Sequence, residues 1–468
     1  MAPETSEEDS ASAPDAEAAP TPEPAYSAFG PWQKRWIVFL AAFASLFSPM
    51  SSFIFYPAIK SIATSLGVTV GLINLAVTTY MVVSGVVPAL LGNAADKFGR
   101  RPIYLLALLI YFAANLGLSL QNTYAGLLVL RMLQSAGSSA PSLGPVLGGV
   151  VAAKLGWKWI FWLLCILGGV CLVLVLLALP ETSRVIVGNG SIPATGIYRT
   201  LTSILTEWRN GHGKTEKANE APILERTTSR SLLPSPIDCL KLFLLGDVAM
   251  VLVCNAIYYT IYCCIQASLS TLFIEVYGYK SLEAGLIYLP FGVACLIGNF
   301  IWGRVLDSEF ARVSKDYGVS ADPVREHGAI VEFPVEKARL RSALFLVVAS
   351  ALATIGYGWT VHYHLHVAAP LAMQAIIGFT GTGLFVAFGT LLTDLNAERA
   401  STAAASANLV RCALAAAALA VLEYIIDGVG VGWCFTIFGL LGGLCVPLMV
   451  WGIRCGGRLR QKRQAAMA

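Results

Sequence analysis

Five polar or aromatic side chains recur on one face of a long apolar stretch, residues 243–273. The later four follow the first by three, four, seven and eleven positions, which places all five in one stripe of an α-helix. Tyrosine rings stack on flat molecules and tyrosine hydroxyls form hydrogen bonds, so the stripe predicts contacts with a small organic ligand in a wet cavity. A hydrogen-bonded seam between helices is the alternative. The residues are Asn255, Tyr258, Tyr259, Tyr262 and Gln266.

A charged side chain occurs inside another apolar region, residues 123–155, where Arg131 precedes Gln134 by about one helical turn. An ionisable group within a membrane helix is costly to bury, and such groups usually serve function. The pair therefore predicts a working role for Arg131. Snorkelling of this side chain, or a purely structural pairing, is the alternative.

Glycines, a carboxylate and basic residues are combined in GNAADKFGRR, residues 92–101, which we name the inner-face motif. Small residues let helices approach closely, and a carboxylate forms charge-assisted hydrogen bonds with arginine. The motif predicts a latch at a helix end, although basic residues at such an end also act simply as a topology signal. The latch residues are Gly92, Asp96, Gly99, Arg100 and Arg101.

A second set of glycines surrounds a proline in GPVLGG, residues 144–149, which we name the glycine–proline motif. Small residues favour close helix packing and proline kinks a helix. The motif therefore predicts a bend, either for packing alone or as part of a functional element. Its members are Gly144, Pro145, Gly148 and Gly149.

The elements that position these residues are membrane helices. The chain of 468 residues is 56% hydrophobic and 13% charged, with a mean hydropathy of +0.68, which excludes a water-soluble domain. An all-α, polytopic membrane protein is predicted, because about 20 apolar residues cross the hydrocarbon core as a helix. The stretches that are long enough are 36–58, 68–91, 102–120, 159–180, 243–273, 282–302, 342–361, 367–393, 402–426 and 432–453.

Basic residues are concentrated in alternate connections, and such connections face the cytoplasm. Both termini and the central loop are therefore predicted to be cytoplasmic. The predicted organisation is a disordered acidic tail (1–28), an amino-terminal transmembrane half (29–180), a cytoplasmic loop (181–241), a carboxy-terminal transmembrane half (242–455) and a basic tail (456–468).

The region 123–155 must cross the membrane an even number of times, because the connections before and after it are both predicted to be cytoplasmic. Two spans with a short connection need on the order of 45 residues. A repeat of Gly-x-x-x-Asp at Gly92 and at Gly303 suggests two halves of six spans each. A short, broken or tilted pair of helices, with Pro141 and Pro145 near the break, is therefore expected; helices 4 and 5 of the twelve nominal spans would be shortened or merged, so that eleven are seen.

The motifs resemble those of the major facilitator superfamily. The inner-face motif matches its loop 2–3 motif, Arg131 and Gln134 match its fourth-helix motif, and the glycine–proline motif is similar to the fifth-helix motif of proton-coupled antiporters. LPETSR (179–184), FPVEKARL (333–340) and NLVRC (408–412) resemble the fungal drug:proton antiporter branch that includes quinidine-resistance exporters. The resemblance covers nearly all of 29–463 and implies a two-by-six helix arrangement. It departs between Ser139 and Gly144, where relatives carry the end of helix 4, a loop and the start of helix 5; a deletion, a skipped exon or a faulty gene model would explain this.

The function that the resemblance implies is export of small organic molecules such as drugs, toxins, secondary metabolites or weak acids, in exchange for protons, at the plasma or vacuolar membrane. Expected partners are the substrate, protons and the lipid bilayer, with a monomeric chain and no nucleic acid. An uptake facilitator for a small nutrient and a truncated, non-transporting protein are the alternatives.

Motifs for other chemistry are not found in the sequence. It has no Walker-type glycine loop, nucleophile elbow or metalloprotease helix, so neither an enzyme nor a cofactor is expected. His362, His364 and His366 alternate without a neighbouring cysteine or carboxylate, and a solvated connection rather than a metal site is expected.

The one glycosylation sequon, Asn189-Gly190-Ser191, tests the predicted topology. We expect Asn189 to remain unmodified, because its loop is predicted to face the cytoplasm, where N-glycans are not added. Mass spectrometry of the chain from its native host checks this, and a glycan on Asn189 would reverse the topology.

Overall fold

A computed structural model of the chain describes residues 30–45, 51, 54–136, 151, 155–187, 196–202, 242–243, 245–318, 333–396 and 400–465. These residues form helices and connections, with no β-strand among them, which confirms the all-α prediction. The helices of the amino-terminal group are α1 (Pro31–Ser45), η1 (Tyr56–Ala58), α3 (Ile59–Leu66), α4 (Val70–Phe98), α5 (Arg100–Leu120), α6 (Tyr124–Ala136) and α8 (Lys158–Ala178). The short α9 (Arg184–Val187) and η2 (Gly196–Tyr198) follow. The carboxy-terminal group contains α12 (Gly246–Tyr277), α13 (Ser281–Leu286), α14 (Leu289–Asp316), α16 (Val335–His362), α17 (Ala368–Leu395), α18 (Ala400–Gly443) and α19 (Cys445–Ala465).

Eight of the described helical stretches are long and apolar enough to cross a membrane. The last of them, Thr402–Gln461, has 60 residues and bends at Gly430, where φ is +81°. Sixty helical residues extend about 90 Å, three times the hydrocarbon core, so this stretch crosses twice, as the separate predictions of 402–426 and 432–453 require. Several helices continue past the predicted apolar stretches; α14, for example, ends at Asp316 rather than near 302, because a helix satisfies its backbone equally well in the polar interface.

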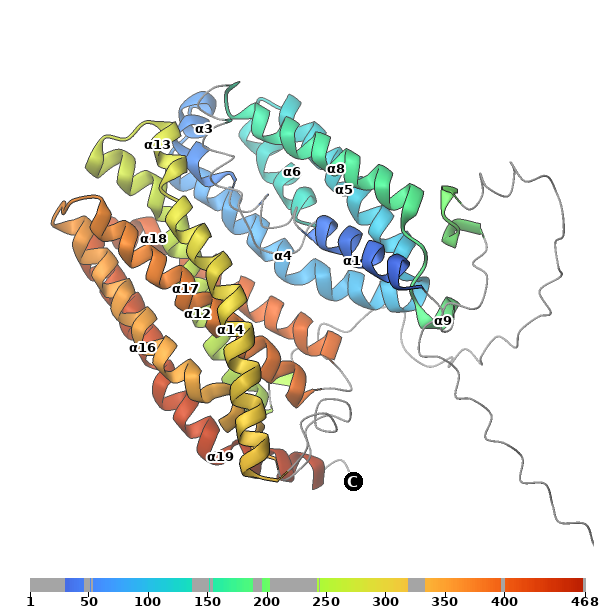
Figure 1. The fold of residues 1–468 in the computed structure, drawn as a ribbon. Coiled ribbons are helices and arrows are strands. Elements are labelled where there is room, and N and C mark those ends of the chain that lie inside the picture. Colours follow the sequence, from blue (N-terminus) through green and yellow to red (C-terminus); the bar gives the residue numbers. More distant parts are fainter. Residues whose placement is uncertain are drawn as a thin grey trace, which may run out of the picture.

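The helices form two groups, which meet at α4 and α18 and also at η1, where the backbone oxygen of Tyr56 accepts a hydrogen bond from Ser270 of α12 (3.0 Å). In Figure 1 the blue to green helices α4, α5, α6 and α8 lie together, and the yellow to red helices α14 to α19 form the other group. Between the groups, α4 packs against α18. The contact is close at Gly85, where a Cβ atom would lie 3.0 Å from Cβ of Cys412. We name this α4–α18 contact the seam.

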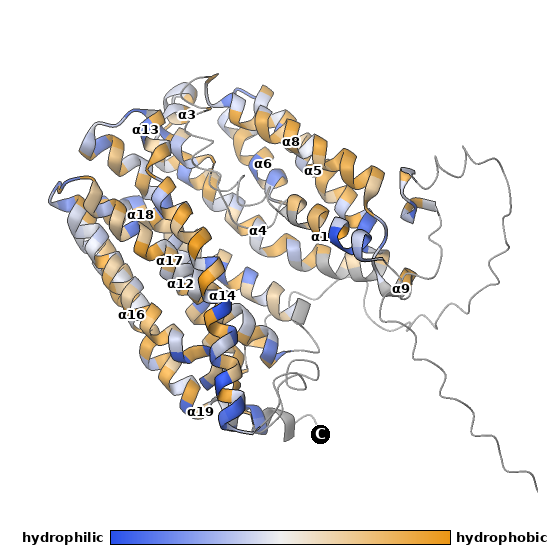
Figure 2. Ribbon diagram, viewed as in Figure 1, coloured by the Kyte–Doolittle hydropathy of each residue, from blue (hydrophilic) through white to orange (hydrophobic). Residues whose placement is uncertain are grey.

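The surface of both groups suits lipid. Large apolar side chains are exposed along the spans, including Phe300 and Phe345, which are 68% and 71% exposed. Figure 2 shows hydrophobic residues along the middle of the helices and hydrophilic residues at the lower ends of α14 and α19. In the apolar part of α12 78% of residues are buried, against 33% for α4, so α12 is the central helix of its group and the stripe predicted on it lies inside the protein.

Within the region 123–155, the structure describes a single short helix, α6. α6 has 13 residues, which extend about 20 Å and fall short of the roughly 30 Å core. Residues 137–150, with Pro141, Pro145 and the rest of the glycine–proline motif, lie outside the described residues. The expectation of a broken pair of helices there stays a prediction.

Candidate functional site

Arg131 on α6 is completely buried in the amino-terminal half. Its Nη1 donates to the backbone oxygen of Ser51 (3.0 Å) and to Oε1 of Gln134 (2.7 Å), one turn further along α6. Its guanidinium lies 4.5 Å from the ring centre of Phe55 and 4.4 Å from that of Tyr80. Nε and Nη2 make no hydrogen bond, and the partners of this cation among the described residues are all neutral groups.

A short hydrogen-bonded network extends from Arg131 to α5. Gln134 Nε2 donates to Oδ1 of Asn115 (2.7 Å), and Asn115 Nδ2 donates to the backbone oxygen of Tyr111 (2.8 Å). The Tyr111 hydroxyl lies 2.6 Å from Oγ of Ser51. The structure thus brings the predicted pair together and adds partners, from α5 and from Ser51, that spacing along the chain does not reveal.

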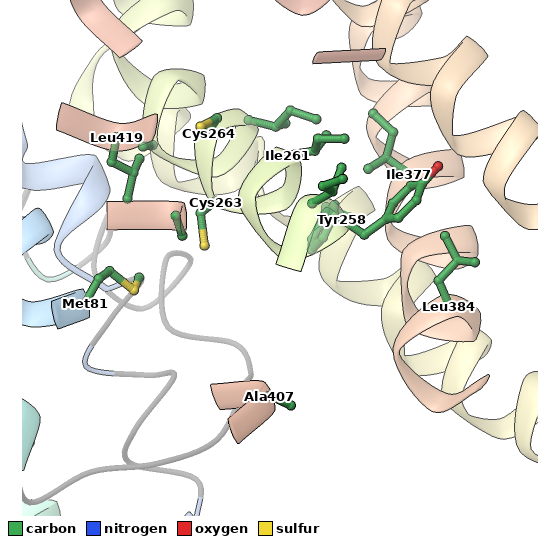
Figure 3. Packing of buried hydrophobic residues seen from close by; sticks show 14 of the residues in the cluster. Met81, Tyr258, Ile261, Cys263, Cys264, Ile377, Leu384, Ala407 and Leu419 are labelled. Carbon is green, nitrogen blue, oxygen red and sulfur yellow. The ribbon is translucent and has the colours of Figure 1, made fainter. Parts of the chain in front are cut away.

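The stripe on α12 is divided between two environments. The Tyr258 hydroxyl lies 3.1 Å from the backbone oxygens of both Val347 and Gly442, inside the carboxy-terminal half. Figure 3 shows Tyr258 with Ile377 and Leu384 of α17, whereas Cys263 lies on the side of Met81 and Leu419. Tyr258 therefore matches the alternative, a hydrogen bond between packed helices of one half, and it is a poor candidate for ligand contact.

Tyr259 and Tyr262 face the other group of helices. The Tyr259 hydroxyl lies 3.8 Å from Sδ of Met81 on α4 and donates to it, and both tyrosines are only half-buried. Their rings stack with centres 6.1 Å apart, and both meet Phe385 of α17 edge to face. Phe291 of α14 lies 5.4 Å from Tyr262. These four rings, Tyr259, Tyr262, Phe291 and Phe385, form what we name the aromatic cluster, a surface suited to stacking on a flat molecule.

Buried amides lie elsewhere on the stripe without hydrogen-bond partners. Both polar atoms of the Gln266 side chain and Oδ1 of Asn255 make no hydrogen bond, although these residues are 2% and 8% exposed. Both polar atoms of the Gln374 side chain on α17 are likewise buried without a hydrogen bond. Buried polar groups are nearly always bonded, so these amides are available to a ligand or to water.

Arg411 of α18 is a further candidate residue, for which the sequence pattern predicts no specific contact. Its Nε and Nη2 donate to Oδ1 of Asn408, at 3.1 and 2.7 Å, and its guanidinium lies 4.9 Å from the ring centre of Tyr259. Asn408 in turn donates across the seam to the backbone oxygen of Ser84 (2.6 Å). The signal that could have found Arg411 is the same as for Arg131, a single arginine in an apolar span.

The inner-face motif forms hydrogen bonds with Glu181, a residue that lies outside the motif. Glu181, just after α8, accepts from the backbone N–H groups of Arg100 (3.0 Å) and Arg101 (3.1 Å) at the first turn of α5. It also accepts from the N–H groups of Thr182 and Ser183, both at 2.8 Å. A carboxylate is favoured there by the helix dipole and the free N–H groups. Gly99, with φ of +93°, precedes the helix and has no side chain to cap it, so Glu181 does so.

The guanidinium of Arg101 is used for packing α5 against its neighbours. It donates to the backbone oxygens of Leu176 (2.8 Å) and Ile197. The side chain of Asp96 and the surroundings of Gly92 lie outside what the structure describes, so a latch through Asp96 stays a prediction. In the carboxy-terminal half the corresponding end is joined by Arg339, whose Nε donates to Asp394 (2.9 Å) and whose Nη1 lies 4.0 Å from Asp307.

Glu181→Gln is expected to destabilise the chain by about 1–3 kcal/mol, because one of the two acceptor oxygens and the negative charge at the start of α5 are lost. Glu283→Gln is the control: Glu283 lies within α13 and accepts from the N–H of Lys280 at the start of that helix (2.9 Å), but it is exposed. Melting curves of the two purified variants in detergent measure the difference. Equal melting temperatures would mean that Glu181 is not a structural cap of α5.

The sequence is similar to known membrane transporters over most of its length. The family described as Major Facilitator Superfamily matches residues 41–142 and 136–420. The MFS-type transporter phiD of a fungal species is 35% identical over 473 aligned residues, covering 94% of this chain and 71% of the relative. Citrate exporter 1 of Aspergillus niger is 30% identical over 484 residues, covering 96% and 91%. Among solved structures, a D-xylose–proton symporter superposes with a TM-score of 0.61 at 13% identity, covering 89% of this chain and 97% of the symporter.

Proposed function

The chain belongs to the major facilitator superfamily, and we propose that it exports small organic molecules in exchange for protons. The observation that carries this proposal is the seam. Across it, Asn74 donates to Glu423 (3.3 Å) and Asn408 donates to Ser84, and beside it Tyr259 of α12 donates to Met81. These three contacts come from the first half of α4, and each is a single weak or neutral contact that a rocking motion can break.

Such a seam suits alternating access, in which two rigid halves rock about a central site. With the predicted topology, the first half of α4 lies toward the outer face. The seam contacts would then close the outer side, and the site between the halves would be reached from the cytoplasm. An exporter takes up its substrate in this state, because the molecules to be expelled are inside the cell.

The substrate site that we propose lies beside the seam. It comprises Tyr259, Tyr262 and Gln266 of α12, with the aromatic cluster supplying ring surfaces and the unbonded amides supplying polar contacts. The name of one relative, citrate exporter, supports export as the direction. Proton exchange rests on the resemblance of the glycine–proline motif to that of antiporters.

Metabolite profiling of cells that express the chain tests the direction and the coupling together. We expect compounds to be enriched in the medium of expressing cells over empty-vector cells, and their cellular level to rise when a protonophore collapses the proton gradient. Accumulation inside expressing cells would instead establish uptake. Export that is unchanged by the protonophore would remove proton exchange.

Tyr259→Ala is expected to change the order of preference among exported compounds, because it removes one ring of the aromatic cluster and the contact with Met81. Two variants serve as controls: Tyr258→Phe removes a tyrosine hydroxyl within the carboxy-terminal half, and Tyr104→Ala removes an aromatic side chain that is 41% exposed on α5. Competition assays with a panel of compounds give the profiles. Three identical profiles would mean that Tyr259 does not contact substrate.

A further inference from the structure

Arg411 lies where the two halves meet; its own contacts come from two helices, and one of its partners is bonded to a third. Asn408 is on the same helix α18, Tyr259 is on α12, and Ser84, which holds Asn408, is on α4 of the opposite half. The residue is half-buried, so it is not fully enclosed by the surrounding helices. All of these partners are described residues, none of them within 137–150.

The positive charge of Arg411 is not neutralised. Its hydrogen bonds use Nε and Nη2 and end on one amide oxygen, and no described carboxylate is in ion-pair distance. The buried arginines at the helix ends differ: Arg339 pairs with Asp394, and Arg460 lies 3.6 Å from Glu336. A cation in a membrane span is costly unless an anion or strong acceptors compensate it.

The same imbalance occurs on the other side of the seam. Arg131 has two nitrogens without hydrogen bonds, and its described partners are neutral. The middle of the protein thus has an arginine in each half and, among the described residues, no carboxylate paired with either. An anion between the halves would be attracted by both charges, whereas a cation would be repelled.

The surroundings of Arg411 also specify the rest of the ligand. Tyr259, against which the guanidinium lies, is the edge of the aromatic cluster, so a group bound at Nη1 has ring surfaces next to it. Arginine binds a carboxylate with charge-assisted hydrogen bonds, and tyrosine and phenylalanine rings stack on flat molecules.

We propose that Arg411 binds the carboxylate of an aromatic organic acid whose ring lies on the aromatic cluster. The proposal rests on the proposed function in treating the space at the seam as a substrate site, and it adds the substrate class. Asn408 acts as a positioning residue, because it orients the guanidinium and is itself fixed to α4.

Binding of three probes with one ring system tests the proposal: 2-naphthoate, 2-naphthylmethanol and 2-naphthylmethylammonium. The full-length chain is purified into lipid nanodiscs, and dissociation constants are measured by equilibrium dialysis. We expect 2-naphthoate to bind at least tenfold more tightly than either of the other probes. Arg411→Gln should weaken 2-naphthoate at least tenfold and leave the alcohol within threefold. Arg304→Gln, which removes an exposed charge on α14, should change neither.

Asn408→Asp gives the same test without a change of size. The new carboxylate would lie 2.7 Å from Nη2 of Arg411 and neutralise it, so 2-naphthoate should again weaken at least tenfold. Retained anion preference in Asn408→Asp and Arg411→Gln, or no saturable binding of 2-naphthoate to the parent chain, would overturn the proposal. The assay needs no transport: Arg411-dependent binding without export, also after the relatives' segment is restored between Ser139 and Gly144, would contradict only the proposed function. Export confined to neutral or cationic compounds would contradict only this inference.

Discussion

Restoring the relatives' segment between Ser139 and Gly144 is expected to raise export per molecule at least tenfold over the chain as it stands. The described part of α6, Tyr124–Ala136, has 13 residues, fewer than a membrane span needs, and residues 137–150 lie outside the described part of the chain. The family matches this chain in two pieces that overlap at 136–142, which is where one continuous match would break if a segment were missing.

The lengths of the alignments support the same conclusion. The alignment with phiD extends over 473 residues, more than the whole chain of 468, although it covers 94% of this chain. Since 94% of 468 residues is about 440, about 33 aligned positions of the relative have no counterpart here. Their total, which the alignment lengths do not assign to one place in the chain, equals about one and a half membrane helices.

A half-length helix would leave the wall of the amino-terminal half incomplete and expose backbone groups that lipid cannot satisfy. The measurement is export rate divided by abundance at the membrane. A glycine-serine insertion of equal length at the same place is the control, because it restores length without a helix. Equal export by the parent, the control and the restored chain would show that the short connection is a working design.

Helix positions were predictable because lipid imposes a strong rule on sequence. A span must be apolar for about 20 residues, so α5 and α8 follow the predicted stretches 102–120 and 159–180 to within two residues. Helix ends were less predictable, since polar residues beyond the core can stay helical, as at the end of α14.

The partners of the candidate residues could be predicted only in part. A helical wheel places Tyr258 and Tyr259 on one face, but it does not say which neighbour each tyrosine meets. Tyr258 meets two carbonyl groups of its own half, and Tyr259 meets α4. Likewise, Glu181 caps α5 from 80 residues away, and no local pattern connects a glutamate after one helix to the start of another.

Arg131→Lys is expected to reduce transport about 100-fold or more in the restored chain, which corresponds to about 2.7 kcal/mol. Lysine keeps the charge but has no planar group to lie between Phe55 and Tyr80. Its ammonium group would need to bond Ser51 and Gln134 from a flexible stem. The buried positive charge would be kept, but the hydrogen-bond geometry of the guanidinium would be lost. Arg304→Lys, on the exposed face of α14, is the control and should transport normally.

Comparison of Arg131→Lys with Arg131→Gln separates charge from shape. If a positive charge alone sufficed at this position, lysine would transport nearly as well as arginine and only glutamine would fail. If the stacked, forked guanidinium is required, both variants fail while their abundance and monodispersity in detergent stay near those of the parent. We expect the second result, because the planar guanidinium lies against the rings of Phe55 and Tyr80 and carries two further nitrogens, Nε and Nη2, that a lysine side chain does not have. Lysine at half of the parent's rate would show that Arg131 acts only through its charge.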